Sequence, residues 1–460
     1  MNDLTQGSVV RHLLQMAAFL AVSMLVQTLY LLADLYWVGR LGKEAIAAVG
    51  IAGNLMMITL ALTQMLGVGT TALIAQATGR KDQAGGERIL NQSLVMSLCV
   101  GAALALTGFL LRDFYCRSLT ADPLTALLAK RYFNWFLPAL VLQFPMVALG
   151  SALRATGIVK PAVGIQVLSV VLNMVLAPLL IFGLGPWPMM GVTGAALATF
   201  ISILLGNALL LLYFERKFHF LRLRLAQCAP RFREWWAILK IGLPAGAEFA
   251  LFSVYMFIVY AIIREFGAAA QAGFGVGARV MQAMFLPVMA LSFAVSPVVG
   301  QNYGGRQPER VRHAVLTALG SASALMAVLT LIAWLFAPKL IRAFTADPQV
   351  IAYGSEYLQI VSLNFLASGV AFTSSSIFQG LGNTIPPLCS TASRLLLFAL
   401  PAILLARRPD FHIRQIWYLS VMSQIIQACV NLLLLRRELR KKLAFEMVPS
   451  LSPTPIAQAS

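Results

Sequence analysis

The sequence has too few charged residues to cover the surface of a water-soluble protein. Only 11% of its 460 residues are charged, whereas 59% are hydrophobic and the mean hydropathy is +0.80. A soluble domain carries roughly 25% charged residues, because its surface must be hydrated. An apolar exterior is stable in lipid. The composition therefore excludes a soluble globular domain and indicates a membrane protein.

The signatures of several protein classes are also missing. There is no GxxxxGK[ST] phosphate loop, which argues against an ATP-driven pump, and no TVGYG-like filter, which argues against a potassium-type channel. The five cysteines and four histidines are scattered, without a CxxC pair or metal-ligand spacing. No paired catalytic carboxylates or Ser/His/Asp set stand out. We predict a protein that is not an enzyme and needs no metal or organic cofactor.

The net charge of +18 would suggest a nucleic-acid partner in a soluble protein. Here the charges lie in short segments between apolar runs, where they set membrane topology and contact anionic lipid headgroups. We therefore predict a lipid bilayer and small molecules as the partners, no nucleic acid, and a monomer.

What is abundant is long apolar runs, each near the roughly 20 residues that one membrane span needs. The first is too long for the apolar core of a signal peptide and is interpreted as a span. Residues 441–460 turn basic and then polar, which predicts a disordered tail. The runs predict twelve helices, at residues 13–38, 46–77, 89–111, 124–150, 161–183, 189–214, 236–263, 268–300, 314–337, 351–378, 385–406 and 413–435.

Basic residues predict the orientation of these spans. Most lysines and arginines fall on the side that carries both chain ends. Because loops rich in Lys and Arg stay in the cytoplasm, both termini are predicted to be cytoplasmic, in a bacterial inner membrane.

An internal repeat divides the chain. A shift of 225 residues places residues 120–123 on 345–348, both Thr-Ala-Asp-Pro, and also Gln76 on Gln301 and Gly79 on Gly304. Six spans return the chain to its starting side, so the two halves are parallel repeats. We predict an all-α polytopic membrane protein with an N-terminal lobe at 1–214, a linker at 215–235 and a C-terminal lobe at 236–440. Two such lobes suit alternating-access transport, although a two-lobed scaffold has the same pattern.

Ionisable side chains inside a span are costly and therefore mark candidate functional positions. Asp34 lies six residues before Arg40, about 9 Å along a helix. It either binds a proton or Na⁺ in a buried site or pairs with Arg40 at the interface. Glu248 lies about 12 Å into its span, counted from Lys240. It is either a coupling or cation-binding acid or a structural side chain bonded to the neighbouring backbone.

Two arginines also remain within apolar runs. Arg279, near the start of the eighth span, either pairs with an anionic group or alternates with a proton, or it extends to the interface. Arg394 is interpreted as structural.

The order of several short segments is similar to that of the MATE (multidrug and toxic compound extrusion) family, over about residues 10–440. The similarity is carried by Asp34 with Val38-Gly39-Arg40-Leu41-Gly42, by Gly242-Leu243-Pro244 with Glu248, and by the segments 75–79, 152–157, 191–199, 299–304 and 379–384. The resemblance implies an antiporter that exports organic, often cationic or aromatic, compounds by using an H⁺ or Na⁺ gradient.

The resemblance also implies roles for single residues. Asp34 would bind the coupling ion, Tyr30 would line the neighbouring pocket, and Asn173 and Thr199 would be polar positions of the cation site. Glu248 matches an acid used in the C-terminal lobe of some members. Arg279 resembles an arginine of the proton-coupled bacterial branch.

Three positions depart from the pattern of the family. Ala177 stands where an acid often follows the span 5 asparagine, which favours H⁺ over Na⁺. No acid accompanies Glu248 in residues 372–378, and Phe19 replaces a proline that often kinks the first span. The expected function is H⁺-coupled multidrug export, with Na⁺ as the other coupling ion. The alternatives are a flippase of lipid-linked saccharides and a channel or structural protein.

Overall fold

The computed structural model describes residues 3–218 and 220–444, and the regular elements in this part of the chain are helices. The first half holds α1 Val9–Gly39, α2 Lys43–Gly79, α3 Gln83–Leu119, α4 Pro123–Ala155, α5 Lys160–Phe182 and α6 Val192–Arg216. The second half holds α7 Phe232–Ile263, α8 Ala268–Gly304, α9 Pro308–Arg342, α10 Pro348–Val361, α11 Asn364–Gly380, α12 Ile385–Ala406 and α13 Ile413–Lys442. Two short 3₁₀ segments, Leu225–Gln227 and Arg264–Phe266, lie beside α7.

Each predicted span corresponds to helix in the structure, but one of them is broken. Eleven of the described helices are long and apolar enough to cross a membrane, and the pair α10–α11, bent by 56°, supplies a twelfth span. The break falls between Val361 and Asn364, inside the predicted span 351–378. The carbonyl of Ser362 accepts a hydrogen bond from Thr330 Oγ1 at 3.1 Å, so one backbone group at the break bonds outside its own helix.

Three predicted boundaries are corrected. α6 continues to Arg216 and α7 begins at Phe232, so the helices extend into the predicted linker 215–235. α13 continues to Lys442, inside the predicted disordered tail 441–460, because Lys442 Nζ donates to the carbonyl oxygen of Leu381 at 2.6 Å. The remainder of that tail, 445–460, lies outside the described residues.

The internal repeat extends to the backbone. The shift of 225 residues maps the bounds of α2 onto those of α8. Lys81 and Arg306 are repeat mates and have positive φ of 59° and 53°. Asp122 and Asp347 are repeat mates and cap the N-termini of α4 and α10 with their side chains. The two halves therefore share helix lengths, caps and turn conformations.

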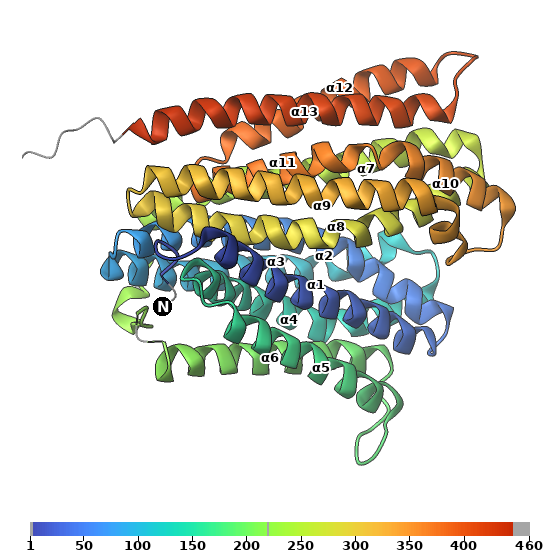
Figure 1. Cartoon of the computed structure of the whole chain (residues 1–460). Coiled ribbons are helices and arrows are strands. Elements are labelled where there is room, and N and C mark those ends of the chain that lie inside the picture. The colour runs from blue at the N-terminus through green and yellow to red at the C-terminus, as the bar shows by residue number, and fades with distance from the viewer. Residues whose placement is uncertain (1–2, 219, 445–460) are drawn as a thin grey trace, which may run out of the picture.

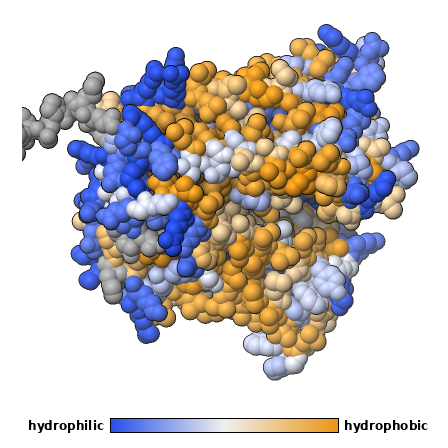
Figure 2. Space-filling model, viewed as in Figure 1, coloured by the Kyte–Doolittle hydropathy of each residue, from blue (hydrophilic) through white to orange (hydrophobic). Residues whose placement is uncertain are grey.

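Figure 1 shows α1–α6 on one side of the molecule and α7–α13 on the other, with the start of α1 and the end of α13 at the same end. We call this the terminal end. The halves pack through α1 and α2 against α7 and α8. Figure 2 shows an apolar belt between hydrophilic ends on the visible face, as a polytopic membrane protein requires.

Two glutamines join the halves at the terminal end. Gln76 Nε2 on α2 donates to the carbonyl of Gly380 at 2.9 Å, and its repeat mate Gln301 on α8 donates to the carbonyl of Ala155 at 2.7 Å. A Cβ at Gly79 would lie 2.0 Å from the Gln301 carbonyl oxygen, and one at Gly304 would lie 2.2 Å from that of Gln76. We call Gln76, Gly79, Gln301 and Gly304 the seal.

The start of the chain reinforces this contact. Leu4 is 1% exposed and packs in the core that α8 and α9 share. Its N–H donates to Gln301 Oε1 at 3.0 Å, and its carbonyl accepts from Asn302 Nδ2 at 3.2 Å and from Arg310 at 3.3 Å. The cross-half hydrogen bonds found among the described residues all lie at the terminal end.

The segment between α6 and α7 is held against α3. Gln92 is fully buried and donates to the carbonyls of Gln227 and Ala229, at 2.6 and 2.8 Å. Its Oε1 accepts from the Arg231 N–H and from Trp235 Nε1, both at 2.9 Å. The connection between the halves is therefore a docked segment rather than a loose one.

Candidate functional site

Asp34 lies in the last third of α1, away from the terminal end. Its Oδ1 is buried and accepts no hydrogen bond from the described residues. Arg40 does not pair with it, because the Arg40 guanidinium donates to the Tyr36 hydroxyl and stacks 4.8 Å from the centre of the Tyr36 ring. The Asp34–Arg40 pair that the sequence left open is therefore not formed.

The other three predicted polar residues of the first half lie beside this acid. Tyr30 is one turn before Asp34, and its hydroxyl lies 3.4 Å from Thr199 Oγ1. Asn173 Nδ2 donates to Thr199 Oγ1 at 3.1 Å. Asn173 is 3% exposed, and its Oδ1 accepts no hydrogen bond in the described part of the chain. The region thus contains two buried acceptor oxygens that lack a donor, which is the arrangement that a proton or small cation can satisfy.

Tyr132 is a further member that the sequence analysis did not assign to the site. It lies on α4, is 4% exposed, and is close enough to interact electrostatically with Asp34 and Tyr30. The available signal was its place in the repeat, because its mate Tyr357 is likewise buried. Ala177, 1% exposed, packs in the apolar core beside this region, so the span 5 position supplies no second carboxylate.

Glu248 on α7 joins a separate hydrogen-bond network in the second half. Its Oε2 accepts from Ser375 Oγ at 2.8 Å, and its Oε1 accepts from Thr391 Oγ1 at 3.2 Å. Thr391 in turn accepts from Gln427 Nε2 at 2.9 Å. Glu248 therefore bonds to side chains of α11 and α12, not to the neighbouring backbone. Sequence reasoning missed these partners because uncharged polar residues are common in spans.

The two arginines within the spans pair with no carboxylate among the described residues. Arg279 on α8 is exposed. Arg394 on α12 lies 4.6 Å from the centre of the Tyr255 ring, and its Nε is buried without a hydrogen-bond acceptor. Tyr255 is the repeat mate of Tyr30. At equivalent places, the first half therefore carries a carboxylate and the second half a guanidinium.

Two six-helix repeats within an apolar belt, joined at one end and containing buried acids within the spans, define an α-helical membrane transporter. The MatE family model matches residues 20–179 and again residues 244–404. The chain belongs to the MATE family of transporters, and its two matched segments coincide with the two halves of the repeat.

Relatives with assigned names share about a quarter of their residues with this chain. The FAD transporter of Shewanella oneidensis is 27% identical over 87% of this chain and 88% of its own length. The probable multidrug resistance protein YpnP of Bacillus subtilis is 27% identical over 83% and 84%. A solved MATE structure, described as the bent conformation, has a TM-score of 0.89 at 28% identity and covers 96% of this chain and 98% of its own.

A second solved structure bears on the conformation. It is described as the outward-facing conformation of a multidrug resistance MATE family transporter, has a TM-score of 0.87 at 27% identity, and covers 96% of this chain and 98% of its own. Together these relatives support drug efflux as the function of the chain.

Proposed function

We propose that this chain exports small organic compounds in exchange for protons, with Asp34 as the group that binds the coupling proton. The supporting observation is the buried Asp34 Oδ1 without a hydrogen-bond donor. A carboxylate in lipid is costly, and protonation removes that cost. Asp34 can therefore exchange a proton with whichever side of the membrane its half faces.

The proposed cycle uses the two halves as rigid bodies. With the termini in the cytoplasm of a bacterial cell, the seal closes the cytoplasmic side, and the outer ends are free to admit water and protons. Proton binding at Asp34 changes its contact with the Tyr30–Thr199–Asn173 chain of hydrogen bonds and favours release of a cationic or aromatic substrate outward. Proton release to the cytoplasm resets the site.

Sodium is the alternative coupling ion, and the same oxygens would hold it. Asp34 Oδ1, Asn173 Oδ1 and Thr199 Oγ1 are the acceptors that this region offers. The apolar Ala177 leaves a single carboxylate, which favours the proton.

The test uses inside-out vesicles loaded with a pH-sensitive dye. Adding a cationic dye substrate to energised vesicles is expected to release protons from the wild type, and Asp34→Asn is expected to abolish this release. Asp113→Asn is the matched control, because Asp113 is an exposed acid that pairs with Lys130 at 2.8 Å. Full coupled export by Asp34→Asn would refute the proposal, and release that requires Na⁺ would replace the proton with sodium.

A second candidate concerns the substrate. The guanidinium of Arg394 over the Tyr255 ring is suited to an aromatic compound with an anionic group, and one relative is named an FAD transporter. Arg394→Gln is then expected to reduce export of a flavin nucleotide and to leave export of a cationic dye unchanged. Equal loss of both would indicate a structural role for Arg394.

A further inference from the structure

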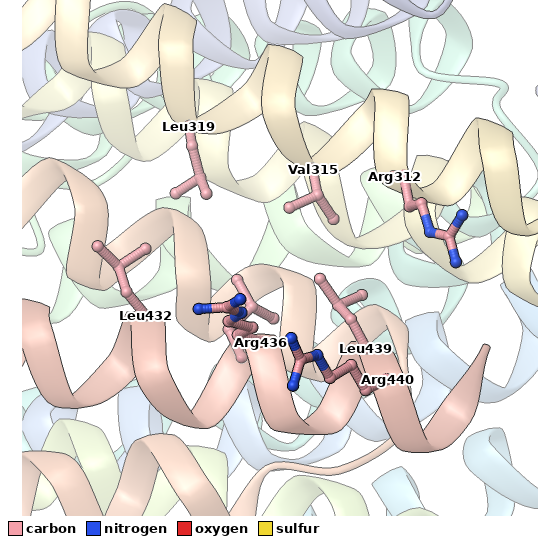
Figure 3. A pocket seen from close by; sticks show the side chains of 8 residues that line it. Arg312, Val315, Leu319, Leu432, Arg436, Leu439 and Arg440 are labelled. Atoms are coloured by element: carbon pink, nitrogen blue, oxygen red, sulfur yellow. The ribbon is translucent and has the colours of Figure 1, made fainter. Parts of the chain in front are cut away.

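A groove lies between α9 and α13 at the terminal end of the second half. Its volume is about 260 Å³. Figure 3 shows the side chains of the two helices facing each other across it, with the arginines toward one end and Leu319 and Leu432 toward the other. The groove is lined by Arg312, Val315, Leu319, Leu432, Leu435, Arg436, Leu439 and Arg440.

Charge and depth are matched along this groove. Counted by helix rise, Arg312 lies about 6 Å from the start of α9, and Arg436 lies about 9 Å from the end of α13. Leu319 and Leu432 lie about 15 to 17 Å from the same ends. The guanidinium groups therefore stand at the edge of the apolar belt, and the leucines stand within it.

The groove has an excess of positive charge. Glu309 pairs with Arg312 at 2.8 Å. The other nearby acid, Glu438, accepts from Asn383 Nδ2 at 2.9 Å and lies 3.8 Å from Lys442 Nζ. In the described part of the chain no carboxylate forms an ion pair with Arg436 or Arg440, and both residues are exposed.

We propose that this groove binds one anionic phospholipid, with the phosphate held by Arg436, Arg440 and Arg312 and an acyl chain lying along Leu319 and Leu432. A soluble anion would use the arginines alone, and the apolar floor at membrane depth is what specifies a lipid. Basic pockets between transmembrane helices are suited to anionic headgroups. Such a lipid would connect α9 to α13 and stabilise the second half.

The purified full chain is titrated with phosphatidylglycerol or phosphatidylcholine of the same acyl composition, and bound lipid is counted by native mass spectrometry. The wild type is expected to prefer phosphatidylglycerol. Each arginine near an anionic headgroup contributes about a fivefold gain in affinity, so Arg436→Gln with Arg440→Gln weakens phosphatidylglycerol binding about thirtyfold. Arg437→Gln is the matched control, because Arg437 is exposed on the same helix but does not line the groove.

Equal weakening by Arg437→Gln would show a diffuse charge effect and overturn the site. Displacement of the lipid by inorganic phosphate alone would show an anion site and overturn the lipid assignment. If the double variant does not fold, a photoactivatable phosphatidylglycerol on the wild type decides the question. Crosslinks at Leu319 or Leu432 support the proposal, and crosslinks confined to other helices overturn it.

Discussion

Gly79→Ala is expected to open the seal. The added Cβ would lie 2.0 Å from the Gln301 carbonyl oxygen, whereas ordinary contact begins at 3.4 Å, so the ends of α2 and α8 must separate by roughly 1.4 Å. The obstacle is backbone, which cannot rotate away as a side chain does. Overpacking of this kind costs about 1–3 kcal/mol. At about 2 kcal/mol the ratio of closed to open terminal ends falls about thirtyfold.

The assay is a distance measurement between spin labels at Arg88 and His313, which are exposed on opposite halves near the terminal end. The variant is expected to lose most of the short-distance population in nanodiscs. Gly53→Ala, also in α2, is the control, because a Cβ there meets nothing within 4 Å. It is expected to leave the distribution unchanged. Identical distributions for the two variants would refute the reasoning.

Two further predictions concern stability. Asp347→Ala removes the side-chain cap of α10 and is expected to lower stability by about 1 kcal/mol in thermal unfolding. The pKa of its repeat mate Asp122, outside the spans, is lowered by hydrogen bonds from the Thr125 side chain and backbone, so the contribution of Asp122 is present at neutral pH and is lost as the pH falls through its folded-state pKa. An unfolding temperature of Asp122→Ala that falls by the same amount at acidic and neutral pH would contradict this. Gln92→Leu leaves the Ala229 carbonyl and Trp235 Nε1 without their partner and is expected to cost about 3 kcal/mol, measured by thermal unfolding against Gln424→Leu as a comparison on another helix.

The fold was predictable because apolar runs and the 225-residue repeat are encoded in local residue types. The break in span 10 was not, because no proline or glycine marks the step from Val361 to Asn364. The bonding of that step depends on Thr330 of another helix. Helix ends were also underestimated, because polar end turns are stabilised by caps that hydropathy does not detect.

The candidate site divides in the same way. Asp34 and Glu248 stood out from the sequence because an acid within a span is rare. Tyr132, Ser375 and Thr391 did not, because such residues occur throughout membrane helices and only their contacts distinguish them. The polarity of Arg394 against Asp34 required the halves to be superimposed.

The binding of Leu4 to α8 and α9 has a consequence for the order of assembly during synthesis. The N-terminal segment leaves the ribosome first, but its partners Gln301, Asn302 and Arg310 are made only after about two-thirds of the chain. Chains are synthesised at roughly 5–20 residues per second, so Leu4 waits on the order of tens of seconds for its site. Its docking therefore reports that the second half has been inserted beside the first, and a chain that ends before α9 leaves this segment without its partners.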